Sequence, residues 1–142
     1  MRGTASTIAL LVAVLLVGCD GLWLDTYWRS EKYVLIAVDA RGQMSLSVDI
    51  GNGMSVGLVG PTVFSIGADD THIVVKQHPS NDRSGNSVDR TTTHYFVVTR
   101  TTSPDLAARQ QGVRGPLGQD EFDRLAAALS LPSFSKTFDD LR

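Results

Sequence analysis

A strict alternation of apolar and polar residues in the middle of the chain constrains the fold more than any other feature. From residue 44 to residue 50 (MSLSVDI), apolar side chains alternate with Ser or Asp, and the alternation resumes over residues 54–58. Side chains along a strand point to opposite faces in turn, so this pattern predicts two strands with one buried face each. Asn52-Gly53 lies between them, and this dipeptide favours a type I′ turn. The segment therefore predicts a β-hairpin.

Other short runs predict more strands. Four segments rich in β-branched and aromatic residues lie at residues 33–38, 63–66, 73–75 and 95–98, a composition typical of strands. Polar residues fill 79–92, and residues 101–118 contain two prolines and two arginines. We expect both of these segments to be loops.

One helix is expected near the C-terminus. Phe122, Leu125, Ala126 and Leu129 recur at the spacing of one helical face, so we expect a stripe that faces the core. The predicted fold class is α+β: an antiparallel β-meander of five to six strands with this C-terminal helix packed on it. A small β-barrel or sandwich is the alternative, because hairpins dominate. Residues 33–142 are expected to form a single globular domain, a suitable length for one core.

The N-terminus has the three parts of a secretory signal. Arg2 and the amino terminus supply positive charge, residues 8–17 are apolar, and the small residue Gly18 precedes Cys19. A membrane-spanning helix needs about 20 apolar residues, and this stretch is much shorter. No A-x-A-like cleavage site lies near it. The segment therefore predicts export rather than a transmembrane anchor.

Leu16-Val17-Gly18-Cys19 resembles the lipobox of bacterial lipoproteins. The resemblance implies that residues 1–18 are a lipoprotein signal peptide and that the Cys19 thiol receives a diacylglyceryl group, after which signal peptidase II cuts before Cys19. The chain contains no other cysteine, so no internal disulfide competes for this thiol. The membrane is therefore an expected partner, through lipid on Cys19.

Residues 19–32 are expected to be a lipidated tether that carries Trp23, Tyr27 and Trp28. These aromatic rings either lie at the level of the lipid headgroups or cover one end of the core. Asp20 resembles the residue that keeps enterobacterial lipoproteins in the inner membrane. The expected location is therefore the cell envelope, at the periplasmic face of the inner membrane.

The last third of the chain is similar to small, uncharacterised bacterial lipoproteins. The similarity lies in Gly115-Pro116-Leu117, in Glu121-Phe122 and in Leu129-Ser130-Leu131-Pro132. It implies no known activity.

No set of residues indicates catalysis. Gly53-Met54-Ser55-Val56-Gly57 matches G-x-S-x-G, but a nucleophile elbow needs a strand before the serine and a helix after it. Here the first glycine belongs to the predicted hairpin turn. Asp69-Asp70-Thr71-His72 is expected to be a turn. We therefore predict no catalytic residue and no cofactor.

His78 and His94 are the residues that can be tested geometrically for metal binding. If strands 72–78 and 94–100 pair around a loop centred near residue 86, the two imidazoles face each other, and Asp82 or Asp89 can complete a zinc-like set. Two surface histidines beside the 79–92 loop are the simpler interpretation. We therefore predict no metal site.

Charge narrows the range of functions. Removal of residues 1–18 takes away one of the 13 Lys and Arg residues and none of the 15 Asp and Glu residues, which leaves a formal charge of −3. This balance argues against nucleic-acid binding. Two functions remain: a non-enzymatic accessory factor that binds an envelope protein partner, and a small enzyme or metal- or ligand-binding lipoprotein that uses His78, His94 and the 79–92 loop.

Overall fold

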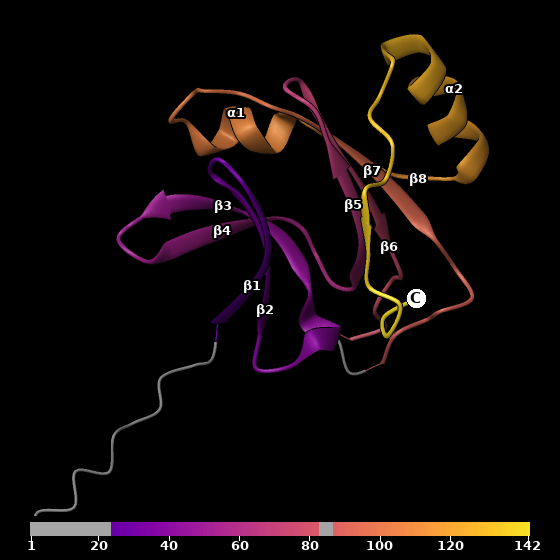
Figure 1. Ribbon diagram of the computed structural model, residues 1–142, viewed down its shortest axis with the longest axis horizontal. Helices are drawn as coiled ribbons and strands as arrows, with labels where there is room; N and C mark the ends of the chain where they lie inside the picture. Colours follow the sequence, from indigo (N-terminus) through magenta and orange to yellow (C-terminus); the bar gives the residue numbers. More distant parts are fainter. Residues whose placement is uncertain (1–23, 83–86) are drawn as a thin grey trace, which may run out of the picture.

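The computed structural model describes residues 24–82 and 87–142, which form two antiparallel sheets and two α-helices (Figure 1). The first sheet has four strands in the order β1-β2-β3-β4. They are β1 (Leu24–Ser30), β2 (Tyr33–Val38), β3 (Ser45–Gly51) and β4 (Met54–Val59), with a short 3-10 helix, η1 (Arg41–Gln43), before β3.

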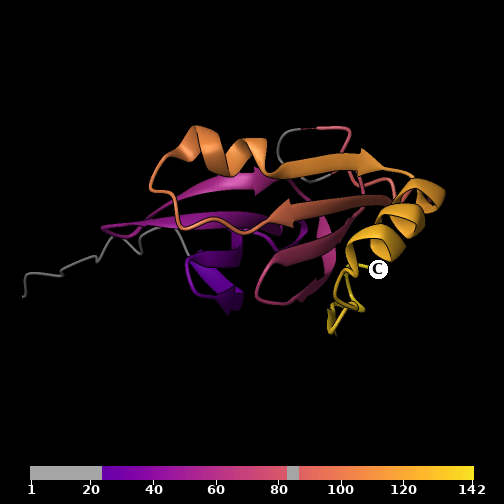
Figure 2. The same ribbon diagram turned by 90° about the horizontal axis from the view of Figure 1, so that it is seen from above.

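The second sheet has five strands in the order β8-β7-β6-β5-β9. They are β5 (Val63–Ala68), β6 (His72–Gln77), β7 (His94–Thr99), β8 (Val113–Leu117) and β9 (Lys136–Thr137). The helices are α1 (Leu106–Gln111) and α2 (Gln119–Leu129). Figure 2 shows α1 and β8 following one another along one side of the molecule, with α2 at its end.

The predicted hairpin is confirmed as β3 and β4. Asn52 and Gly53 have φ values of 57° and 72°, as a type I′ turn requires at both central positions. The strands predicted at 33–38, 63–66, 73–75 and 95–98 are also present, as β2, β5, β6 and β7.

The main core lies between the two sheets. Its members are Tyr33, Leu35, Met44, Leu46, Val59, Val63, Phe64, Ile66, Ile73, Val75, Val98, Phe138 and Leu141. Strand β6 has apolar residues on both faces, because Val74 packs into a second cluster on the other side of the five-stranded sheet. This cluster lies under α2, where Val74 meets Tyr95, Val97 and Phe122. The five-stranded sheet is thus the middle layer of the molecule (Figure 1).

The prediction of one meander with five to six strands is therefore correct only in part. The chain is mostly β, as two antiparallel sheets with a short C-terminal helix, and the alternative of a closed barrel is wrong. Helix α2 covers the outer face of the five-stranded sheet rather than the main core. Phe122 is buried, whereas Leu129 is 42% exposed, so the predicted core-facing stripe does not reach the end of the helix.

Part of the predicted tether belongs to the folded domain. Residues 24–30 pair with β2 as strand β1, and Tyr27 and Trp28 pack against the main core. The ring of Tyr27 meets the ring of Phe138 edge-on, with centroids 6.1 Å apart. These two aromatics cover the core, as one of the two interpretations predicted, while Trp23 lies outside the described residues.

The segment 101–118 is not a simple loop, since it contains α1 and β8. Asp105 caps α1, because its carboxylate accepts a hydrogen bond of 3.0 Å from the backbone amide of Ala107. An Asp at this position stabilises a helix start. Strand β8 depends on its partner β7, with which Leu117, Arg114 and Val113 pair.

Candidate functional site

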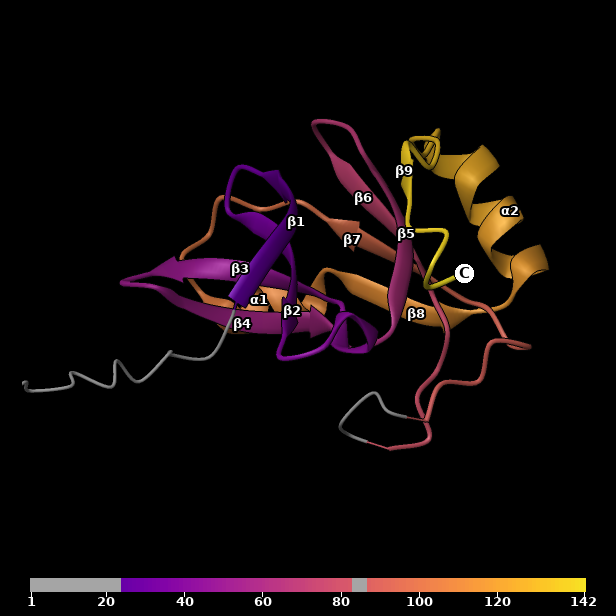
Figure 3. The same ribbon diagram turned by 60° about the horizontal axis from the view of Figure 1, so that its bottom comes forward.

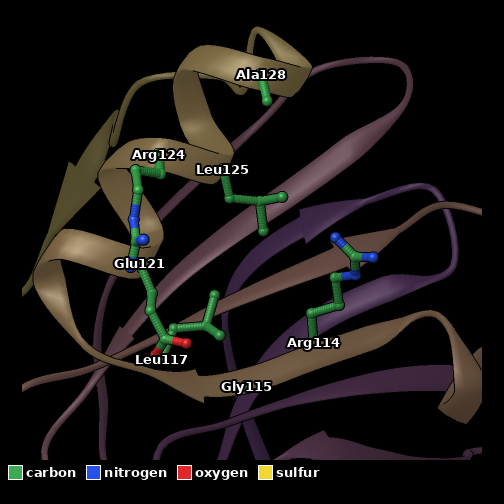
Figure 4. Close-up of a pocket in the computed structure, with 7 residues that line it drawn as sticks. All are labelled: Arg114, Gly115, Leu117, Glu121, Arg124, Leu125 and Ala128. Carbon is green, nitrogen blue, oxygen red and sulfur yellow. The ribbon is translucent and has the colours of Figure 1, made fainter.

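A groove of about 590 Å³ lies between α2 and the edge strand β8 (Figure 4). Its lining combines three apolar side chains with three charged ones and one glycine: Leu117, Leu125, Ala128, Arg114, Glu121, Arg124 and Gly115. We call this feature the α2–β8 groove. The residues come from both elements, which follow one another along the chain (Figure 2).

The packing of α2 determines which helix face borders the groove. Phe122 stacks on Tyr95 with ring centroids 4.8 Å apart, and the Tyr95 hydroxyl donates a hydrogen bond of 2.5 Å to the side chain of Gln119. These contacts hold one face of the helix against the sheet. Residues spaced by three or four positions share a helix face, so Glu121, Leu125 and Ala128 together line the groove.

Gly115 allows β8 to lie close to β7 beneath the groove. A Cβ at Gly115 would lie 2.4 Å from Cδ1 of Phe96 and 2.8 Å from the carbonyl oxygen of Tyr95, and the residue has a φ of +140°. Any other residue there would be strained both by contact and by backbone conformation.

The groove is lined by both charged and apolar side chains. Glu121 accepts a hydrogen bond of 3.3 Å from the Gly118 amide, and the Nε of Arg124 donates to the carbonyl of Asp120 at 3.2 Å. Arg114 is exposed, and no described residue forms a hydrogen bond or ion pair with its guanidinium. The groove therefore presents a cation beside an apolar surface, which suits an apolar side chain next to a carboxylate. No Ser, Cys or His lines it.

His78 and His94 do not face each other as the assumed register required. Gln77 pairs with His94, one residue away from that register, and a shift of one residue moves a side chain to the other face of a sheet. His78 instead lines a pocket of about 290 Å³ together with Lys76 and Tyr95. Among residues 24–82 and 87–142, no group of three His, Cys, Asp or Glu residues can hold a metal ion.

The interpretation of His78 as a surface histidine is wrong, because the residue is buried. It is 3% exposed, its ring stacks on Phe64 with centroids 4.1 Å apart, and its Nδ1 donates to the carbonyl oxygen of Thr92 at 2.7 Å. Its buried Nε2 has no hydrogen-bond partner in the described part of the chain. The charged residues that share its pocket, Arg90 among them, are all cations, which opposes a metal ion at this nitrogen.

The end of the 79–92 segment is organised by Asp89. Its carboxylate accepts hydrogen bonds from the Thr91 hydroxyl at 2.6 Å, the Thr92 hydroxyl at 2.7 Å and the Thr91 amide at 2.9 Å. These bonds, that of the Thr91 hydroxyl first, lower the pKa of Asp89 to about 2, because they stabilise the charged form.

This low pKa predicts a pH dependence. A carboxyl whose pKa is lowered by folding stabilises the native state above its unfolded pKa of about 3.9, and this contribution is lost as the pH falls through the folded value. We therefore expect the difference in melting temperature between the wild-type protein and Asp89→Asn to be constant above about pH 4 and to shrink between about pH 4 and pH 2. Carbon NMR of the Asp89 carboxyl checks the assignment, and a midpoint near 4 would contradict it.

The structure describes two of the other residues considered in the sequence, Asp69 and Ser55, and places each outside the groove. Asp69 forms a turn, since its carboxylate accepts hydrogen bonds from the amides of Thr71 and His72 at 2.8 Å and 2.6 Å. Ser55 lies exposed on β4 rather than between a strand and a helix. Cys19 and Asp20 lie outside the described residues. Within the described ranges, no helix is both long enough and apolar enough to cross a membrane.

Sequence reasoning missed the groove. The spacing of Glu121, Leu125 and Ala128 is visible in the sequence, but the segment that faces them was assigned to a loop. A Val-Arg-Gly-Pro-Leu strand carries no clear alternation, so only its pairing with β7 reveals Arg114 as a groove residue.

The fold defines a mostly β protein with two antiparallel sheets. Comparisons of the chain with protein-family models, with curated proteins and with solved structures gave no match. Function is therefore inferred from the residues of this chain alone.

Proposed function

We propose that this chain is a lipid-anchored lipoprotein of the bacterial cell envelope that acts without catalysis and binds a segment of an envelope protein in the α2–β8 groove. The anchor is Cys19, and Asp20 favours the periplasmic face of the inner membrane. The amphipathic groove is the observation that supports protein binding. Its occupant is a peptide segment with an apolar side chain for the apolar lining residues and an adjacent acidic residue for Arg114.

The position of the anchor supports this function. Strand β1 starts at Leu24, five residues after Cys19, and five extended residues span at most about 18 Å. The domain would therefore lie close to the bilayer. Figure 3 shows the start of β1 at the opposite end of the molecule from α2, as does Figure 1. The groove would thus lie on the other side of the molecule from the attachment point.

Two adjacent alanines on α2 provide a matched test. Ala128 lines the groove, whereas Ala127 is exposed and does not line it. A photo-crosslinking amino acid introduced at Ala128 is expected to give one discrete protein adduct in living cells, and the same amino acid at Ala127 is expected to give none. Gel mobility and mass spectrometry of the adduct identify the partner.

Charge reversal at Arg114 tests whether the partner segment contributes an acidic residue. Arg114→Glu, combined with the crosslinker at Ala128, should reduce the adduct about tenfold or more, because the pair with the partner's carboxylate becomes a repulsion. Equal adducts at positions 127 and 128, no adduct at 128, or insensitivity to Arg114→Glu would each contradict the proposed groove function.

A further inference from the structure

Arg109 is an arginine of α1 that is largely buried. It lies in the last turn of α1 and is 5% exposed, yet no described residue forms a hydrogen bond or ion pair with its guanidinium. Among the described residues, the guanidinium makes a cation–π contact with the ring of Tyr33, whose centroid lies 5.8 Å from the guanidinium carbon. An arginine is rarely this buried unless it is paired, so this side chain is a candidate for binding an anion from outside the chain.

Arg109 lines a pocket of about 320 Å³. The other lining residues are Glu31, Lys32, Tyr33, Thr101 and Thr102. This second pocket, the Arg109 pocket, is formed by the β1–β2 turn, the start of β2 and the segment that leads into α1. It shares no residue with the α2–β8 groove.

Two hydroxyl groups in the pocket are free to donate. The Tyr33 oxygen accepts a hydrogen bond of 3.1 Å from the Thr101 amide, and the Thr101 hydroxyl oxygen accepts one of 3.1 Å from the Ser103 amide. In the described part of the chain, neither hydroxyl hydrogen has an acceptor. The residues that line the pocket therefore include two O–H donors as well as Arg109, and these are groups that bind an oxyanion.

The neighbouring residue Arg100 differs from Arg109, because its guanidinium has both hydrogen-bond and ion-pair partners. Arg100 donates two hydrogen bonds to the Ser30 hydroxyl oxygen, at 2.7 Å and 3.0 Å, and lies 3.7 Å from the Glu31 carboxylate. Glu31 is thus already paired, and its side chain is 77% exposed. Lys32 and Arg109 remain as positive charges of the pocket that Glu31 does not balance.

We infer that the Arg109 pocket binds a small oxyanion, a carboxylate or phosphate group of a ligand in the surrounding water. The planar guanidinium matches both groups by two parallel hydrogen bonds, and the Tyr33 and Thr101 hydroxyls supply further donors. The inference does not depend on the groove function, because the two sites share no residue.

Anion titration of the full-length chain in detergent tests this site at constant ionic strength. Inorganic phosphate and acetate are the two probes, chloride is the reference, and the readouts are the amide NMR signal of Thr101 and the melting temperature. At least one probe should shift the Thr101 signal saturably and raise the melting temperature. A response to phosphate alone indicates a phosphate ligand, and a response to acetate alone indicates a carboxylate.

Variants separate a binding role from a structural one. Arg109→Met should weaken anion binding more than about tenfold, and without anion its melting temperature should equal or exceed that of the wild type, because an apolar side chain replaces an unpaired buried charge. Tyr33→Phe keeps the ring and should weaken binding about tenfold. Arg41→Met removes one exposed charge outside the pocket and should leave binding unchanged. A saturable shift retained in both Arg109→Met and Tyr33→Phe, or no shift with either anion, would overturn the inference.

Discussion

Gly67→Ala is expected to destabilise the protein by about 3 kcal/mol or more, the upper range for forcing extra atoms into a packed site. A Cβ at this position would lie 2.0 Å from the carbonyl oxygen of Ser133, 2.8 Å from its carbonyl carbon and 3.0 Å from the Cα of Phe134. All three atoms belong to the backbone, so no side-chain rotation can relieve the contact.

The contacted backbone cannot easily move away. The Ser135 amide donates to the carbonyl of Ile66 at 3.0 Å, and the Phe138 amide donates to the carbonyl of Phe64 at 2.8 Å. Phe134 also packs against the cluster under α2, while Phe138 belongs to the main core. Displacing this C-terminal segment from β5 would therefore disturb both clusters.

Gly57→Ala is the matched control. Gly57 lies on the edge strand β4, and a Cβ there would meet no atom within 4 Å. Replacing such a glycine reduces the entropy of the unfolded chain, so we expect a change between zero and a stabilisation of about 1 kcal/mol. Urea denaturation of both variants measures the difference, and equal free energies of unfolding would show that the C-terminal segment does not pack on β5 as described.

The strands that could be predicted from the sequence are those whose own residues show an alternating or an apolar, β-branched pattern. Residues 44–50 alternate strictly, and β6 and β7 are rich in valine and other apolar residues, because both of their faces are buried. Strands β1, β8 and β9 lie at sheet edges. They contain charged residues, Gly and Pro, or only two residues, so their strand conformation depends on pairing with a neighbour.

The division into two sheets is also a tertiary property. A series of hairpins is compatible with one sheet or two, and only the burial of Val74 on one side of β6 and of Ile73 and Val75 on the other indicates three layers. The same limit applies to the sites. The prediction that His78 faces His94 assumes a strand register derived from the centre of a loop. The observed register differs by one residue, so the two side chains point to opposite faces of the sheet. Arg109 lies in a short helix without an apolar repeat, so its burial could not be inferred from spacing.

The proposed anchor predicts an all-or-none effect of Cys19→Ala. A lipobox cysteine supplies the thiol that becomes acylated, so the variant should incorporate no labelled palmitate and should keep its 18-residue signal peptide as an unprocessed precursor. The wild-type protein should carry the label and migrate as the shorter form. Because each buried methylene contributes about 0.8 kcal/mol to membrane affinity, the loss of two or three acyl chains removes the attachment that they provide.

Asp20→Ser is the control for this change. It leaves the thiol intact, so acylation and cleavage should continue as in the wild type, while the protein should move from the inner to the outer membrane fraction if the sorting resemblance holds. Normal acylation of Cys19→Ala would exclude the lipid anchor. Fractionation of Asp20→Ser tests the location separately, because a labelled protein that stays in the inner membrane contradicts only the sorting role of Asp20.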